Sequence, residues 1–135
     1  MAAKVLVVED DSDTRDMIVT FLRREGFDVY GAEDGQVALN VITIEHPDLI
    51  VTDIQMPNLD GIQLIKALRG MPEICSVPIL VLSAHRSGVV KDALSAGASA
   101  TARKPVQVDV LLDLINQLLL PSLLFAIADV IGKLQ

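Results

Sequence analysis

The sequence predicts one α/β domain built on a five-stranded parallel sheet that is covered by helices on both faces. Five short apolar runs alternate with segments of helical periodicity, which is typical of strands joined by helical crossovers. The runs are residues 5–8, 27–30, 49–52, 79–82 and 100–103. The first, third and fourth are almost continuously aliphatic and predict central strands, whereas the second alternates and the fifth is small and polar, which indicates edge strands. Right-handed crossovers then favour a doubly wound sheet that binds ligands at the carboxyl ends of its strands.

Helical periodicity predicts a helix after each of the five strands. A capping residue, Ser12 or Asp13, begins the first helix. The residues expected to end the first four helices are Gly26, Pro47, Gly70 and Gly97. The fifth helix is expected from about residue 107 to residue 118, where aliphatic side chains repeat at helical spacing.

A further helix is predicted for the C-terminal tail, so we divide the chain into a domain over residues 1–120 and an amphipathic helix over 121–135. Aliphatic residues occupy one wide face of this helix, and polar residues share the other. The helix either covers its own domain or packs on a partner, including a second copy in a homodimer. Because Pro121, Asp129 and Lys133 interrupt the tail, it falls short of the roughly 20 apolar residues that a bilayer requires, and we expect no membrane span.

Composition excludes several classes of function. The 135 residues carry a net charge of -7 with no cluster of basic residues, which argues against a nucleic-acid partner. Aromatic residues make up 3% and tryptophan is absent, so the stacking platforms of single-strand binders are missing. Cys75 is the single cysteine and no secretory signal precedes the first strand. We therefore expect a cytoplasmic protein without a disulfide.

Acidic residues follow two central strands. Glu9 and Asp10 come directly after the first strand, and Asp53 comes after the third. Because these strand ends meet at one edge of the sheet, the carboxylates should converge and repel one another. A hard cation, with Mg²⁺ as the leading candidate, would offset that repulsion. The alternative is that acidic residues only cap the next helix or lie in water, which applies to Asp11 and one of its neighbours and less well to Asp53.

Two more polar side chains are expected at the same edge. Ser83 follows the fourth strand and Lys104 follows the fifth. A hydroxyl group and an ammonium group placed there would suit a phosphoryl group. Taken singly, Ser83 is better explained as a helix cap and Lys104 as a solvated surface charge. Together with the acidic cluster at the other strand ends, these alternatives are less credible.

These motifs resemble those of receiver domains of two-component response regulators, and the resemblance covers about residues 4–119. The motifs are the strand that ends in Glu9-Asp10-Asp11, the segment Asp53-Ile54-Gln55-Met56-Pro57, the pair Ser83-Ala84 and the pair Lys104-Pro105. The resemblance implies a flavodoxin-like fold with strand order 2-1-3-4-5. It also implies a partner, either a sensor histidine kinase or a phosphotransfer protein, whose phosphohistidine phosphorylates Asp53.

The resemblance further implies how the metal is held. Asp10 and Asp53 would bind Mg²⁺, with Glu9 supporting the ion through water and the backbone carbonyl of Gln55 completing the set. The chain would then be a phosphoacceptor that signals through protein contacts, and not an enzyme, although the same site would slowly hydrolyse its own acyl phosphate.

The remaining site residues are assigned in the same way. Ser83 and Lys104 would hold the phosphoryl oxygens, and Gln55 and His85 would influence the hydrolysis rate. Thr101 departs from the family pattern, because this position usually carries Tyr or Phe, whose ring moves inward on phosphorylation. The phosphorylation site therefore looks complete, whereas the aromatic ring that usually reports phosphorylation is missing.

Two other interpretations stay open. The first is a pseudo-receiver, an interaction module whose phosphorylation site is unused, although a degenerate site would be expected to have lost Glu9, Asp10, Asp53 or Lys104. The second is an enzyme of similar topology, either a flavin carrier or a phosphohydrolase. A flavin carrier needs a phosphate-binding loop after the first strand, where the acidic residues of this chain would repel a phosphate.

Overall fold

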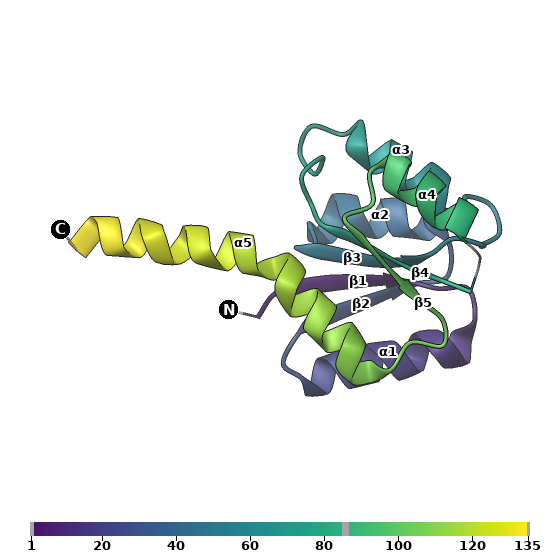
Figure 1. Ribbon diagram of the computed structural model, residues 1–135, viewed down its shortest axis with the longest axis horizontal. Helices are drawn as coiled ribbons and strands as arrows, with labels where there is room; N and C mark the ends of the chain where they lie inside the picture. The colour runs from purple at the N-terminus through teal and green to yellow at the C-terminus, as the bar shows by residue number, and fades with distance from the viewer. Residues whose placement is uncertain (1, 85–86, 135) are drawn as a thin grey trace.

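The computed structural model describes residues 2–84 and 87–134, and it contains the predicted parallel sheet between two layers of helices (Figure 1). The strands are β1 (Lys4–Val8), β2 (Asp28–Ala32), β3 (Leu49–Asp53), β4 (Ile79–Ser83) and β5 (Ala100–Arg103). The helices are α1 (Ser12–Arg24), α2 (Gly35–Glu45), α3 (Gly61–Arg69), α4 (Ser87–Ala96) and α5 (Val108–Leu134). All strand pairs are parallel and the order is β2-β1-β3-β4-β5, which confirms the expected flavodoxin-like topology.

Both faces of the sheet are buried, which explains the aliphatic runs of the central strands. Leu6 and Val8 of β1 pack into a core beneath α2, α3 and α4. Val5 and Val7 point the other way, into a second core formed with α1 and the first half of α5. A shift of one residue would exchange the two faces, so this alternation fixes the register of β1. The residues that follow Val8 are thereby placed at the carboxyl edge of the sheet.

The first helix begins one residue earlier than the sequence indicates. Asp11, rather than Ser12 or Asp13, is the N-cap of α1, and its carboxylate accepts a hydrogen bond of 3.0 Å from the backbone N–H of Thr14. The prediction of Ser12 or Asp13 is wrong because three adjacent residues are all good capping types, and only the chain direction after β1 selects among them. Asp11 therefore caps the next helix, which is the alternative given above for part of the acidic segment after β1.

The C-terminal tail is helical as predicted, but it is not a separate helix. α5 runs from Val108 to Leu134 without a break, so the expected end of the fifth helix near residue 118 is wrong. Proline inside a helix removes one backbone hydrogen bond and bends the axis, yet it need not end the helix. Figure 1 shows α5 changing direction midway and its second half extending away from the sheet instead of folding back over it. Among the described residues, no helix is both long enough and apolar enough to span a membrane.

Arg69, the last residue of α3, links the end of this helix to the segments that precede β4 and β5. Its guanidinium donates hydrogen bonds to the carbonyls of Cys75 and Val77 before β4, at 2.8 and 2.7 Å. It also donates to the carbonyl of Gly97 after α4, at 2.9 Å. One side chain thus holds the entry to β4 and the entry to β5 together, which fixes where both strands begin.

We expect Arg69→Met to lower the free energy of unfolding by about 2 kcal/mol, because three charge-assisted hydrogen bonds are lost together. Urea denaturation monitored by circular dichroism measures this loss. Lys66→Met, one turn earlier on the exposed side of α3, is the matched control and should change stability far less. Equal losses in the two variants would contradict the role given to Arg69.

Candidate functional site

The carboxyl ends of β1 and β3 bring three acidic side chains together. Glu9 and Asp10 follow β1, and Asp53 is the last residue of β3. One carboxylate oxygen from each lies within 4.8 Å of the other two. The sequence predicted this convergence, and the parallel pairing of Val8 with Thr52 produces it.

Lys104 reaches this cluster from the end of β5. Its Nζ lies 2.6 Å from Glu9 Oε1 and 3.1 Å from Asp53 Oδ2. Its backbone N–H donates to the carbonyl of Ser83 at 2.9 Å, which holds the ends of β4 and β5 side by side. Lys104 is therefore not a solvated surface charge, because its ammonium group is paired with two acidic side chains.

Burial controls the charge of Glu9. Its side chain is 3% exposed, and Oε2 has no hydrogen-bond partner within the described part of the chain. Burial raises the pKa of Glu9 to about 7, and the neighbouring Asp53 adds to this rise while Lys104 opposes it. For Lys104, burial would lower the pKa, but hydrogen bonds and negative charge from Glu9 and Asp53 outweigh it and raise the pKa. Lys104 therefore remains an ammonium group.

The donor set fits a hydrated divalent cation. Mg²⁺ prefers carboxylate and carbonyl oxygens and keeps several waters. The three convergent carboxylates supply such oxygens, and one lysine does not neutralise them. A buried carboxylate oxygen without a partner, as at Glu9, is a group that a bound ion or its water would satisfy.

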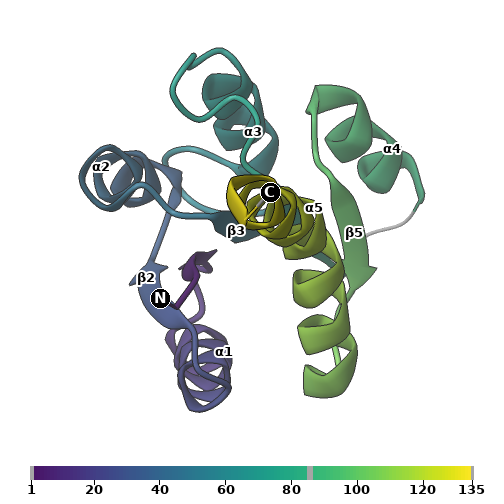
Figure 2. The ribbon, with the colours of Figure 1, turned by 90° about the vertical axis from the view of Figure 1, so that its left-hand side faces the viewer.

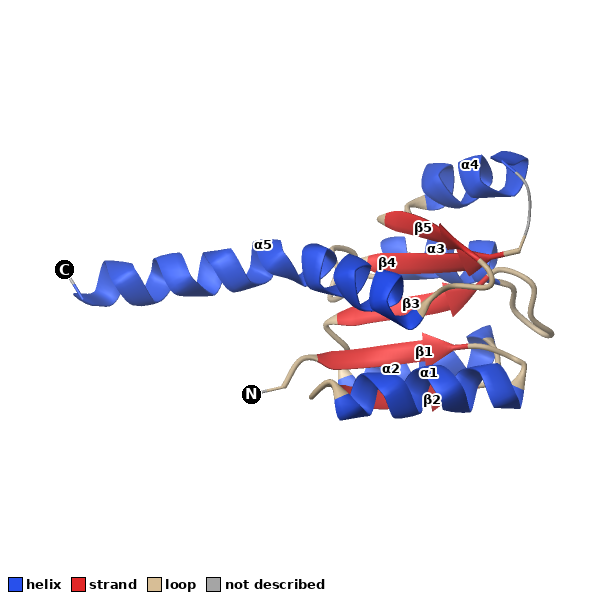
Figure 3. Cartoon of the chain, turned by 60° about the horizontal axis from the view of Figure 1, so that its bottom comes forward, coloured by secondary structure: helices blue, strands red, loops and turns tan. Residues whose placement is uncertain are grey.

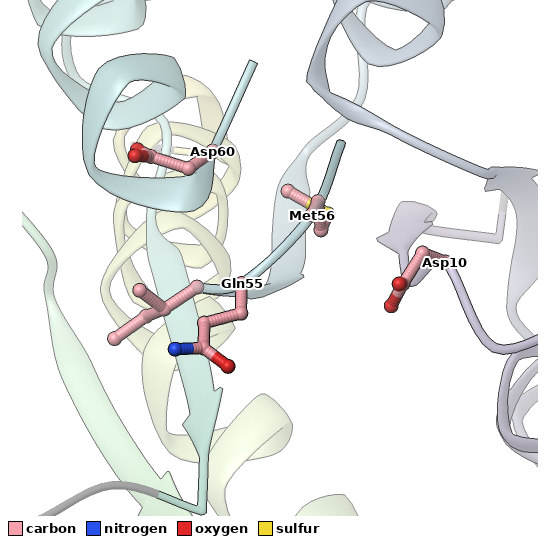
Figure 4. A pocket seen from close by; sticks show the side chains of 5 residues that line it. Asp10, Gln55, Met56 and Asp60 are labelled. Atoms are coloured by element: carbon pink, nitrogen blue, oxygen red, sulfur yellow. The ribbon is translucent and has the colours of Figure 1, made fainter. Parts of the chain in front are cut away.

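An open pocket of about 540 Å³ lies beside the acidic cluster. Figure 4 shows Asp10 on one side of it and Gln55 on the other, with Met56 between them on the loop after β3 and Asp60 on the same side as Gln55, at the start of α3. Asp53 lies at the base of this loop, where its Oδ1 accepts a hydrogen bond of 2.7 Å from the N–H of Ile54. The residues next to Asp53 are therefore open to a ligand that enters this pocket.

Comparison with known proteins assigns the family. Residues 5–116 match the family model of the response regulator receiver domain. The chain is a receiver domain. It is 47% identical over 103 residues to the transcriptional regulatory protein PrrA of Mycobacterium tuberculosis, a match that covers 76% of this chain and 43% of PrrA. It is 38% identical over 120 residues to the response regulator MprA of the same species, covering 88% of this chain and 51% of MprA.

Solved receiver structures share the fold. The chemotaxis response regulator CheY4 of Vibrio cholerae matches with a TM-score of 0.83 and 30% identity, covering 87% of this chain and 99% of that one. A Francisella response regulator receiver domain matches with a TM-score of 0.82 and 35% identity, covering 89% and 98%. The receiver domain spans about half the length of the curated relatives PrrA and MprA.

Ser83 and Gln55, also predicted for the receiver site, lie at the same edge. Ser83 ends β4 and is buried, and Gln55 is exposed at the pocket. His85 lies outside the described residues. Thr101 is partly buried in β5 and pairs with Val81, so a small side chain stands where the family usually carries a ring.

Sequence reasoning overlooked Asp60. This residue lines the pocket and also caps α3, where its carboxylate accepts from the N–H of Gln63 at 2.8 Å and the Gln63 side chain accepts from the Asp60 N–H at 3.0 Å. The spacing of an acidic residue and a glutamine three positions later is the signature of a capping box, so the sequence carried the signal. The cap fixes where the loop after β3 ends.

The metal-free receiver domain should lose stability as the pH rises from about 5 to 8. The pKa of Glu9 is higher in the folded chain than in the unfolded chain, so the folded state binds the proton more tightly. The stability gained from this proton is lost as the pH rises through about 7. We expect a loss of about 1–2 kcal/mol, less than the full shift implies because water reaches the site.

Urea denaturation in EDTA at several pH values measures this dependence. Glu9→Gln should flatten the profile over the same range, and saturating Mg²⁺ should reverse the loss in the parent. A parent profile that matches that of Glu9→Gln would show that Glu9 does not titrate in this range.

Proposed function

We propose that Asp53 accepts a phosphoryl group from the phosphohistidine of a sensor histidine kinase or phosphotransfer protein. The observation that carries this proposal is the contact of Lys104 Nζ with Asp53 Oδ2, at 3.1 Å, inside a cluster of three carboxylates. Asp10 and Asp53 would hold Mg²⁺ with the carbonyl of Gln55, and Glu9 would support the ion through water. The signal would then pass to other proteins through surface contacts.

The chemistry follows from these positions. An Asp53 oxygen attacks phosphorus in line, the new P–O bond forms as the P–N bond to the donor imidazole breaks, and the imidazole leaves with the bonding electrons. Bound Mg²⁺ supplies Lewis-acid stabilisation of the phosphoryl oxygens. Lys104 is already beside the acceptor carboxylate, so its ammonium group would donate to a phosphoryl oxygen after a small movement. The hydroxyl of Ser83 would donate to another.

The same geometry limits the lifetime of the product. A water placed in line with the acyl phosphate would hydrolyse it slowly, so the chain acts as a timed phosphoacceptor rather than a turnover enzyme. The cytoplasm is the proposed compartment, since the phosphodonor is found there and Cys75 is the single cysteine. The competing pseudo-receiver would keep the Lys104 contacts and never be phosphorylated.

Incubation with Mg²⁺ and acetyl phosphate should add the mass of one phosphoryl group to the parent chain and none to Asp53→Asn. Intact-mass spectrometry measures the adduct, and EDTA should abolish it because the metal offsets the charge around the acceptor. If the parent gains no adduct while a known receiver is labelled by the same donor, the pseudo-receiver is the better account.

We also propose that α5 joins two copies of this chain in a homodimer. The second half of α5 extends away from the sheet (Figure 1) and is seen end-on in Figure 2. Ile127, Val130 and Ile131 on it are 46%, 56% and 51% exposed. Residues 121–135 carry one Asp and one Lys, so this segment is neutral in a chain of net charge -7, and two such segments approach without repulsion. A helix with so many exposed aliphatic side chains gains stability when it is buried against another.

Light scattering should give the mass of a dimer for the parent and of a monomer for the double variant Ile127→Lys and Ile131→Lys. Each lysine places a charge in the proposed interface, where it loses its hydration. Ile44→Lys is the matched control, because Ile44 is 73% exposed on α2 and lies outside α5. A monomeric parent would refute the homodimer.

A further inference from the structure

The loop between β3 and α3 is tied to the start of α2 by one pair of side chains. Asn58 Nδ2 donates to Asp34 Oδ2 at 2.8 Å. Asp34 is the N-cap of α2, where its other oxygen, Oδ1, accepts from the N–H of Val37 at 2.9 Å. Asp34 is 6% exposed, and these hydrogen bonds lower its pKa, so it stays ionised. One carboxylate thus serves both a helix and a loop.

The backbone around Asn58 is suited to this contact. Asn58 has a φ of 68°, a left-handed conformation that asparagine adopts more readily than most residues. The loop also lies directly on α2, because a Cβ at Gly35 would come within 2.5 Å of the carbonyl oxygen of Leu59. Within residues 55–59, as far as the structure describes them, the bond from Asn58 is the one side-chain hydrogen bond.

The ends of the loop are closed beside Asp53. The N–H of Gly61 donates to the carbonyl of Ile54 at 2.8 Å, and a Cβ at Gly61 would lie 2.3 Å from the carbonyl oxygen of Asp53. The two ends are therefore fixed by backbone contacts, and the middle is held by Asn58. Between these points lies Gln55, whose side chain faces the pocket opposite Asp10 (Figure 4).

We infer that Asn58 is a positioning residue for the metal site, acting through its hydrogen bond to Asp34. The bond holds the loop in the conformation that places the Gln55 carbonyl for Mg²⁺, and without it the loop has to be ordered when the ion binds. Ordering on binding weakens affinity. This inference rests on the proposed function, because it assumes that Mg²⁺ binds at Asp10 and Asp53.

Two substitutions break the bond from opposite sides. Asn58→Gly keeps the left-handed backbone accessible and removes the amide. Asp34→Ser keeps a good N-cap for α2, but its hydroxyl is too short to reach Asn58. We expect each variant to bind Mg²⁺ about three- to ten-fold more weakly than the parent in isothermal titration calorimetry, which corresponds to one lost hydrogen bond.

Three further results separate positioning from general destabilisation. The double variant should bind Mg²⁺ no more weakly than either single variant, because both remove the same bond. Amide hydrogen exchange should increase at residues 55–59 in each. Ile42→Val, which removes one methyl group from the buried face of α2, should lower stability yet leave Mg²⁺ affinity unchanged.

The outcomes distinguish this inference from the proposed function. If the parent binds Mg²⁺ and is phosphorylated while Asn58→Gly binds the ion equally well, Asn58 does not position the site and the proposed function stands. If the parent neither binds Mg²⁺ nor gains a phosphoryl group, both fail. Additive losses in the double variant would also overturn the inference, because the two residues would then act separately.

Discussion

Lys104 lies 2.6 Å from Glu9 and 3.1 Å from Asp53, and the arrangement of the site depends on these two contacts. Like charges at the end of a buried sheet repel one another, and burial makes the charge on Glu9 costly. One ammonium group reduces this repulsion without removing it, so the cluster stays negative and favours a divalent cation. The same ammonium group stands where charge would build up on a transferred phosphoryl group. A single side chain therefore holds the resting site together, and in the proposed reaction it would also stabilise the transferred group.

The fold is what delivers Lys104 to the acidic residues. Parallel strands end at one edge (Figure 3), so Glu9 after β1, Asp53 at the end of β3 and Lys104 after β5 all lie there. β5 is an edge strand of small residues, and its last position pairs with Ser83. Arg69 sets the entries to β4 and β5, and the backbone bond from Lys104 to Ser83 sets their exits. Contacts at both ends of β4 and β5 thus determine the position of the ammonium group.

Most of this could be predicted from the sequence, because burial on both faces of a sheet leaves a clear aliphatic pattern and parallel topology brings strand ends together. The resemblance to receiver domains supplied the strand order, which periodicity does not determine. Local rules failed where several adjacent residues were equally good capping types, as at the N-cap Asp11, or where a helix continued through a proline, as at Pro121. The bond between Asn58 and Asp34 was not visible, since 24 positions separate the residues and each has a sufficient local role.

The long α5 places its exposed second half far from the acidic cluster. The helix begins near the carboxyl edge of the sheet, runs back along it, and its second half leaves at the opposite edge from the acidic cluster (Figure 3). Contacts made by Ile127 and Ile131 therefore do not obstruct the open pocket beside Asp10. Because Thr101 has no ring to move, a change at Asp53 would have to pass through packed elements. The first half of α5 packs on the same core as β1 and β4, so it is a physical link between the sheet that carries the acidic cluster and the extended helix.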